Sequence, residues 1–498
     1  MDSTTTSDTV ATRAMDALPG PRPWPLVGNA LQIQRERFHL QLEEWARQYG
    51  SPFTFSIRER RFMVVTQADS IGQVLRRRPD LFRRTERIEK VSAQMGFLGL
   101  FTASGDTWRR QRPMVLAGLD PAHIRQFFPA LVKVTDRLRR RWEKAAREGA
   151  VIDLQADLMR YTVDVTTGLA FGEDLNTLES AGDATIQQHL NVVMPALFKR
   201  LLSPMDPPAW LRRMRDREME PHLRALRTAV HDFIAKARAA LQARPELREQ
   251  PQNLIQALVA ARDRPGSGVT DEDVAGNVLT MLLAGEDTTA NTLAWMLWHL
   301  HRHPEAAAAA REEVDRVLGG ANGVHSLEQL AKLDVVEACA SETMRLKPVA
   351  PFIMNQALGD TVVEGVSVRK GQMVICLMRP PGLQEQEFPQ PERFDPLRWR
   401  AEGAAAHAMA SAKRHTMPFG AGPRMCPGRY LALAEIKLAA AMVLANFELE
   451  EVAPEGGGEP RERIAIVMAP VGLKMRLRPR GPRAGLNPAT PTSPAAGA

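Results

Sequence analysis

The stretch Phe419-Gly-Ala-Gly-Pro-Arg-Met-Cys-Pro-Gly428 carries the strongest signal in the sequence. Three glycines around one cysteine predict a tightly bent loop whose backbone amides can approach the sulfur of Cys426 closely. The pattern from Arg429 to Asn446 is helical, so the positive end of a helix dipole should lie just behind the cysteine and favour thiolate over thiol. Such a loop suits an axial cysteine ligand of iron. The alternative is a buried, inert cysteine in a glycine-rich turn.

A long helix is predicted upstream of this loop. Thr270 and Asp273 form a start typical of a capping box, apolar residues recur afterwards, and His303-Pro304 ends the pattern. At about 30 residues, or roughly 45 Å, this helix can cross a whole domain. It contains Ala284-Gly-Glu-Asp-Thr-Thr289, and polar residues in an apolar helix require a reason. A purely structural reason is available if Thr288 bonds back to a carbonyl of its own helix and Asp287 finds a salt bridge.

The rest of the chain indicates a mainly α fold with a smaller β region, an α+β class in one large domain. Helical patterns dominate from about Ile71 to Leu346, with breaks expected near Pro113, 204–208, 265–268 and Pro304. Strands are predicted at Phe53–Ile57, Phe62–Thr66 and Thr361–Cys376, and in a hairpin over Ile464–Leu477 that turns near 470–472.

Composition sets the boundaries of this domain. Residues 1–17 and 481–498 are predicted to be disordered, so the folded domain should cover 18–480. Its first segment, Leu18–Asn29, is too rich in proline for a helix or a central strand and is expected to be extended. Apolar residues make up 44% and charged residues 25%, as is typical of folded, water-soluble proteins.

Charge and cysteine content narrow the possible classes of protein. The net charge of +7 is spread over scattered arginines and short clusters such as Arg76-Arg77-Arg78, which favours solvated helix faces. No nucleic-acid-binding motif is present. The most apolar stretch, 278–300, is interrupted by Glu286, Asp287 and Asn291, so no transmembrane span is expected. With no secretory signal and only three cysteines, the sequence favours a cytoplasmic location.

The cysteine stretch matches the pattern Phe-x-x-Gly-x-Arg-x-Cys-x-Gly at every fixed position, and here the sequence resembles the cytochromes P-450. Three further motifs of that family occur in the family order. They are Trp108-Arg-Arg-Gln-Arg112, Ala284–Thr289 and Glu342-Thr-Met-Arg345. Taken alone, Trp108 and Arg112 would also fit simple packing or a cation–π contact. The resemblance covers roughly Leu18 to Arg480.

The resemblance implies haem b, iron protoporphyrin IX, as the cofactor, with Cys426 as the metal ligand. Trp108, Arg112 and Arg424 are then expected to meet the haem propionates. Gly285 is expected to leave room for oxygen, while Asp287 and Thr288 would steer protons to it. The full set of cofactor-contacting residues expected from the resemblance is Trp108, Arg112, Ala284, Gly285, Phe419, Gly420, Arg424, Cys426 and Gly428.

The resemblance also implies a buried Glu-Arg-Arg cluster that supports the cysteine loop. Glu342 and Arg345 share a helix face, and Arg393 of Pro391-Glu-Arg-Phe394 is the expected third member. A solvated surface pair is the alternative for Glu342 and Arg345. The sequence departs from the family pattern at Asn355, where many relatives have a propionate-binding arginine, at Pro380-Pro381, where Asp-Pro is common, and at Pro113. The haem is therefore expected to depend more on Arg112 and Arg424.

The expected reaction is insertion of one oxygen atom into an unactivated C–H or C=C bond of an apolar substrate, with the other atom leaving as water. Two alternatives are a haem-thiolate enzyme that uses or rearranges a peroxide, and a haem-binding sensor without turnover. The candidate substrate contacts, each of which also fits an ordinary core position, are Met95, Phe97, Leu98, Val193, Met194, Met281, Val349, Phe352 and Met468.

Electrons are expected from separate proteins. The sequence shows no reductase extension, no second cysteine cluster and no nucleotide-binding glycine fingerprint. The resemblance then implies a ferredoxin or flavodoxin together with an NAD(P)H-dependent reductase. Its docking face would lie behind the cysteine loop, and an acidic partner would be steered there by charge. The basic residues expected to gather on this face are Arg109, Arg110, Lys413, Arg414 and Arg429.

Overall fold

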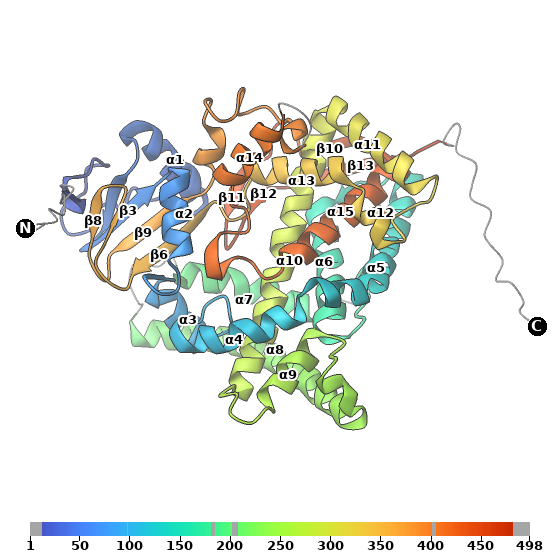
Figure 1. Ribbon diagram of the computed structural model, residues 1–498, viewed down its shortest axis with the longest axis horizontal. Helices are drawn as coiled ribbons and strands as arrows, with labels where there is room; N and C mark the ends of the chain where they lie inside the picture. The colour runs from blue at the N-terminus through green and yellow to red at the C-terminus, as the bar shows by residue number, and fades with distance from the viewer. Residues whose placement is uncertain (1–11, 97, 181–184, 202–207, 401–404, 482–498) are drawn as a thin grey trace, which may run out of the picture.

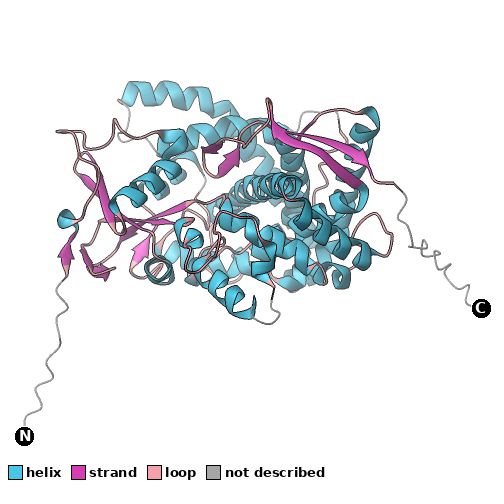
Figure 2. Ribbon diagram, turned by 90° about the horizontal axis from the view of Figure 1, so that it is seen from above, coloured by secondary structure: helices cyan, strands magenta, loops and turns pink. Residues whose placement is uncertain are grey.

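The computed structural model describes residues 12–96, 98–180, 185–201, 208–400 and 405–481. Helices form most of the molecule, and a sheet with α1 and α2 lies at one side (Figure 1). Seen from above, most strands lie toward the two ends, and helices fill most of the middle (Figure 2). The predicted mainly α fold with a smaller β region is confirmed.

The helices have the following bounds: α1 Phe38–Tyr49, α2 Ala68–Arg76, α3 Glu86–Met95, α4 Gly105–Gly118, α5 Pro121–Glu148, α6 Leu154–Phe171, α7 Thr185–Leu201, α8 Ala209–Ala243, α9 Leu254–Arg262, α10 Asp271–Arg302, α11 Pro304–Leu318, α12 Leu327–Ala331, α13 Asp334–Leu346, α14 Ala405–His415 and α15 Arg429–Asn446. The strands are β1 Arg13–Ala14, β2 Phe53–Ile57, β3 Arg60–Val65, β4 Phe82–Arg83, β5 Ile152–Asp153, β6 Phe352–Ala357, β7 Thr361–Val363, β8 Val366–Val368, β9 Met373–Leu377, β10 Phe447–Pro454, β11 Glu462–Ile464, β12 Met468–Pro470 and β13 Leu473–Pro479.

Helix α10 is the long helix that the sequence predicts. Its capping box is present: the Asp273 amide donates to Thr270 Oγ1 at 3.0 Å, and the Thr270 amide donates to Asp273 Oδ2 at 3.1 Å. The helix is 32 residues long and largely buried, because it crosses the middle of the molecule and packs along α6 (Figure 1). In the described part of the chain, no helix is both long and apolar enough to cross a membrane.

A five-stranded sheet has the order β2-β3-β9-β6-β4, in which β3 and β9 are parallel. Side chains alternate between its two faces. Met63 and Val374 pack into a small apolar cluster on one face, and Val64 and Ile375 belong to the main core on the other. Both faces of the sheet therefore carry buried apolar side chains.

The predicted hairpin over Ile464–Leu477 is wrong. Strand β11 pairs with β12, so the turn of that hairpin lies at 465–467 and not at 470–472. Strand β13 pairs instead with β10 and β5. Gly472, with a φ of +72°, allows the sharp change of direction that sends β12 and β13 into different sheets.

Two other sequence expectations differ from the structure. Pro113 lies inside α4 and does not end it, because the helix places Trp108, Met114 and Val115 in the core. Residues 12–17, expected to be disordered, form β1 and a 3₁₀ turn, since β1 pairs with β8 and Met15 is buried. Residues 1–11 and 482–498 lie outside the described residues.

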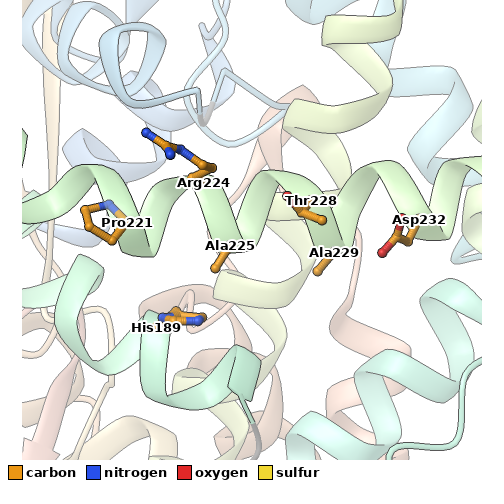
Figure 3. A pocket seen from close by; sticks show the side chains of 7 residues that line it. All are labelled: His189, Pro221, Arg224, Ala225, Thr228, Ala229 and Asp232. Atoms are coloured by element: carbon orange, nitrogen blue, oxygen red, sulfur yellow. The ribbon is translucent and has the colours of Figure 1, made fainter.

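A groove of about 520 Å³ lies between α7 and α8 (Figure 3). His189 of α7 faces Ala225 and Ala229 of α8 across it, while Arg224 points away. None of the residues that line this groove is among those predicted to bind a cofactor or to act in catalysis. The groove is therefore not the site that the sequence predicts.

Candidate functional site

The cysteine loop is a closed turn immediately before α15. The Cys426 amide donates to the Phe419 carbonyl at 2.9 Å, which closes the loop. Gly420 and Gly422 both have φ of +71°, a left-handed conformation that favours glycine. A Cβ at Gly422 would lie 2.6 Å from the Cα of Arg76, so the loop also packs tightly on the end of α2. The predicted loop and the predicted helix from Arg429 to Asn446 are confirmed.

The surroundings of Cys426 act on the pKa of its thiol in opposite directions. Burial raises the pKa of its thiol, while the Gly428 amide, Arg112 and Arg429 act in the opposite direction without cancelling the effect. The positive surroundings therefore offset only part of the cost of burying a thiolate. A bound metal cation would supply the remaining stabilisation, because a coordinating thiol is deprotonated outright.

The middle of α10 borders accessible space. Ala284 is exposed and Thr288 half-buried, although most of this helix is buried. Residues of the cysteine loop, including Phe419 and Gly420, are half-buried as well. Because α15 starts at this loop and packs against α10, the two segments belong to one region of the molecule.

Gly285 lies where α10 closely approaches α6. A Cβ at this position would lie 2.6 Å from Thr166 Oγ1 of α6, so glycine is required where α6 and α10 cross. The side of Gly285 that lacks a side chain thus faces a neighbouring helix. A Cβ on Gly285 would point toward α6, so this contact does not bear on the prediction that the glycine leaves room for oxygen.

Asp287 and Thr288 lie side by side on α10. The Thr288 hydroxyl donates to the Ala284 carbonyl at 2.9 Å, which is the back-bond that a purely structural threonine would make. Asp287, in contrast, has no salt bridge among the described residues, and burial raises the pKa of its carboxyl to about 6. The structural alternative therefore accounts for Thr288 but leaves Asp287 unexplained.

The three residues expected at the propionates lie together. The Arg424 guanidinium is 5.0 Å from the ring centroid of Trp108, which is buried. Arg112 Nη2 donates to the Met425 carbonyl at 2.7 Å, and Arg424 Nη2 donates to the Ala103 carbonyl. Arg424 Nη1 is buried and has no hydrogen-bond partner in the described part of the chain. Burial, followed by the nearby charges of Arg78 and Arg112, lowers the pKa of Arg424 to about 10.

Sequence reasoning missed two arginines in this region. Arg78 is only 1% exposed although its cluster, Arg76-Arg77-Arg78, was expected to be solvated. The positive charges of Arg78 and Arg424 act on Arg84, which places all three near one another. No pattern in the sequence separates these arginines from exposed ones, because their neighbours come from distant segments.

The Glu-Arg-Arg cluster is buried, as the resemblance implies. Arg345 Nε and Nη2 donate to the two Glu342 oxygens at 2.8 and 2.6 Å. The third member, however, is not Arg393, whose side chain is exposed and bonds to Gln390. Arg398 lies 3.4 Å from Glu342 and takes that place, and Arg393 contributes only its carbonyl, which accepts from Arg345.

This cluster connects α13 to the chain that leads to the cysteine loop. Arg345 Nη1 donates to the carbonyls of Gly382 and Pro391 at 2.6 and 2.7 Å. Glu342 accepts from the indole of Trp399 at 2.9 Å and from the Asp395 amide at 3.0 Å. Pro380-Pro381 begins a 3₁₀ turn that delivers the Gly382 carbonyl, so this departure from the family pattern is accommodated.

Asn355, the other departure, is fully buried in β6. Its side-chain amide donates to the Ile353 carbonyl at 3.1 Å and contacts Cys376 Sγ at 3.6 Å. The amide oxygen has no partner among the described residues. Asn355 therefore brings no charge to the region where the resemblance places an arginine.

The candidate substrate contacts lie mostly in the main core. Met95, Val193, Met281 and Met468 are buried there, with Leu98 and Phe352 packed against them. Two of the candidate residues are hydrogen-bonded to each other: the Met468 amide donates to the Val349 carbonyl at 2.8 Å. Phe97 and the side chain of Met194 lie outside the described residues.

The basic residues expected on a docking face are partly neutralised. Arg109 pairs with Asp80 at 3.0 Å and Asp106 at 2.9 Å, and Arg414 pairs with Asp69. Arg110 lies 3.9 Å from Asp273, and Arg429 bonds to the Tyr430 hydroxyl. Lys413 is exposed. The surface is thus less basic than the sequence suggests.

The residues present fit a haem. They provide one thiol at a bent loop, accessible space beside the middle of α10, and several buried or half-buried arginines for which no carboxylate partner is found in the described part of the chain. Haem supplies the matching chemistry, namely iron for the thiolate and two propionates for the arginines.

Comparison with known proteins agrees with this fit. A family model for cytochrome P-450 matches residues 18–477. The chain is 28% identical to human cytochrome P-450 4B1, and the match covers 95% of this chain and 92% of that protein. It is 24% identical to the chloroplastic protein LUTEIN DEFICIENT 5 of Arabidopsis thaliana, covering 91% of this chain and 76% of that one.

A self-sufficient cytochrome P-450 monooxygenase of Penicillium freii is 28% identical over 93% of this chain, which spans only 43% of that relative's length. Among solved structures, the cytochrome P450DA heme domain superposes with a TM-score of 0.79 at 24% identity, over 93% of this chain and 98% of that one. The family model matches nearly the whole chain, and the bent cysteine loop and the arginines beside it agree with that match. The chain therefore belongs to the cytochrome P-450 family and is a haem-thiolate monooxygenase with haem b as its cofactor.

Proposed function

We propose that this enzyme inserts one atom of O2 into an apolar organic molecule, by hydroxylation or epoxidation, and that Asp287 and Thr288 deliver the protons this reaction requires. Haem bound through a cysteine thiolate supplies electron density that favours cleavage of the O–O bond. The protein must then provide ordered protons. The observation that carries the proposal is Asp287, a carboxyl beside accessible space with a pKa raised to about 6 and no salt bridge among the described residues.

The two side chains have complementary roles. A carboxyl with a pKa of about 6 can hold and release a proton near neutral pH, which is the range in which general acids are most effective. The Thr288 hydroxyl donates to Ala284, so its oxygen is held in a fixed direction and keeps lone pairs free to accept another hydrogen bond. The Thr288 hydroxyl would therefore fix the position of the path along which protons move. Asp287 would supply the protons.

Thr288→Ala should uncouple the reaction. Without the fixed hydroxyl, protons arrive without order, so NAD(P)H consumption should continue while most of it yields hydrogen peroxide and not oxidised substrate. Substrate affinity should change little. The measurement is the ratio of product to NAD(P)H consumed, with peroxide assayed in parallel.

Thr292→Ala is the matched control, because Thr292 makes the same back-bond, to the Thr288 carbonyl at 2.8 Å, one turn farther along α10. Its coupling should stay near that of the unmodified enzyme. Equal coupling in the Thr288 variant and the unmodified enzyme would contradict the proposed role. An enzyme that turns over with peroxide but not with O2 would favour the peroxide-using alternative, and a haem protein that consumes no NAD(P)H would favour a sensor.

We further propose that the substrate is apolar and that electrons come from a ferredoxin or flavodoxin and an NAD(P)H-dependent reductase in the cytoplasm. The candidate contacts Met281 and Met468 are apolar, which supports the first part. For the second, Lys413 is an exposed cation on α14, and Arg112 and Arg429 flank Cys426. Acidic partners would be attracted to this side.

The rate of reduction should fall as salt rises above about 0.1 M, where the Debye length is about 10 Å. Lys413→Glu should slow reduction by the acidic partner without changing substrate affinity. Lys474→Glu, on β13, is the control for the same change in net charge. Stopped-flow reduction at several salt concentrations measures both effects. A salt-independent rate would exclude the basic docking face, and substrate oxidation by the purified chain with NAD(P)H alone would exclude a separate partner.

A further inference from the structure

Arg78 is a buried cation for which the described residues provide no acidic partner. It lies two residues beyond the end of α2 and is 1% exposed, yet its one hydrogen bond in the described part of the chain joins Nε to the Leu75 carbonyl at 3.3 Å. Burial lowers its pKa to about 10. Its guanidinium reaches the cysteine loop, since Nη2 lies 3.8 Å from the position a Cβ would take on Gly420.

Arg84 is a second cation of this kind. Its guanidinium lies 3.8 Å from the ring centroid of Phe101. Burial, and after it the charges of Arg78 and Arg424, lower its pKa well below the usual value. No hydrogen bond or ion pair of this side chain is found among the described residues. The adjacent Arg83 is different, because it pairs with Glu86 and Glu89.

Three arginines that repel one another therefore meet beside the cysteine loop. Holding like charges together away from water is costly unless an anion compensates them. A guanidinium binds a carboxylate through two parallel hydrogen bonds, so a pair of carboxylates would match this group well. The described residues provide no carboxylate that pairs with Arg78 or Arg84.

Arg78 and Asn355 both lie near Cys376. Cys376 Sγ is contacted by the amide of Asn355, and the same cysteine lies near the Arg78 charge. Arg78 thus lies close to the point where the sequence lacks the arginine found in many relatives. A positive charge is present there, but it comes from the segment after α2 and not from β6.

We propose that Arg78 and Arg84, together with Arg424, bind the two propionate groups of the haem, and that Arg78 supplies the charge missing at Asn355. The proposal rests on the presence of haem b and is independent of the substrate. A carboxylate on a substrate could bind these arginines in the same way as a haem propionate. The experiment must therefore distinguish a substrate carboxylate from the propionates.

The test is the rate at which the holoenzyme loses haem to an excess of apomyoglobin. Arg78→Gln and Arg84→Gln should each lose haem at least about tenfold faster, because each removes a charged hydrogen bond. Arg77→Gln and Arg83→Gln are the matched controls. Arg77 is exposed and bonds to Thr361, and Arg83 already has acidic partners, so both should stay within about twofold of the unmodified enzyme.

Reconstitution with haem dimethyl ester identifies the source of the carboxylate. The ester has no propionate charge, so the variants and the unmodified enzyme should then lose it at similar rates. Arg84→Lys, which keeps the charge, should retain natural haem better than Arg84→Gln. Because Arg78 is fully buried, Arg84→Gln and Arg84→Lys decide the question if Arg78→Gln does not accumulate in folded form.

Three results would overturn the proposal: unchanged retention of natural haem in Arg84→Gln, an equal acceleration with the ester, or an effect confined to the binding of carboxylate-bearing substrates. None of them would affect the assignment of Cys426, because the carbon-monoxide spectrum reports that ligand separately.

Discussion

Cys426→Ser should abolish the red-shifted Soret band that thiolate-ligated haem gives with carbon monoxide. The hydroxyl of serine is a far weaker iron ligand than a thiolate and cannot donate comparable electron density. The loop itself should survive, because its closing bond uses the Cys426 backbone amide and its turns depend on Gly420 and Gly422. The measurement is the reduced carbon-monoxide difference spectrum, with total haem assayed separately.

Cys339→Ser and Cys376→Ser are the controls. Both thiols are fully buried, and burial raises the pKa of Cys376 to about 12, so neither is disposed to form a thiolate. These variants should keep the band. Retention of the band in Cys426→Ser, or its loss in either control at unchanged haem content, would show that the ligand has been misassigned.

The second large effect is expected at Arg345. Arg345→Leu removes both hydrogen bonds that the buried Glu342 carboxylate accepts from Arg345, and breaking a buried pair in this way costs about 3–5 kcal/mol. The carbonyls of Gly382 and Pro391 would also lose their donor, which loosens the segment that precedes the cysteine loop. A strong fall in the midpoint of denaturant unfolding and in haem content should follow.

Two other arginines of the same segment test the corrected cluster. Arg393→Gln should change the free energy of unfolding by no more than about 0.5 kcal/mol, because its side chain is exposed. Arg398→Gln should cost more, since it removes a cation 3.4 Å from buried Glu342. If Arg393→Gln were the more destabilising of the two, the original assignment of the third member would be restored.

Local patterns predicted the parts of the fold that depend on neighbouring residues. The capping box of Thr270 and Asp273 fixed the start of α10, and glycines at 420 and 422 predicted the bent cysteine loop. The hairpin near the C-terminus failed because strand partners are chosen at long range. β13 finds a better partner in β10 than in the strand just before it.

The sequence by itself determined the family, and it predicted the ligand Cys426 and the pair Asp287 and Thr288, because these follow from motifs whose residues are close together in the chain. Only the tertiary structure decided that Gly285 serves helix packing, that Arg398 replaces Arg393, and that Arg78 and Arg84 join Arg424. The physical reason is that burial and charge at an arginine depend on segments far away in sequence. An arginine in a solvated cluster and one without a counter-charge inside the protein look the same until the chain is folded.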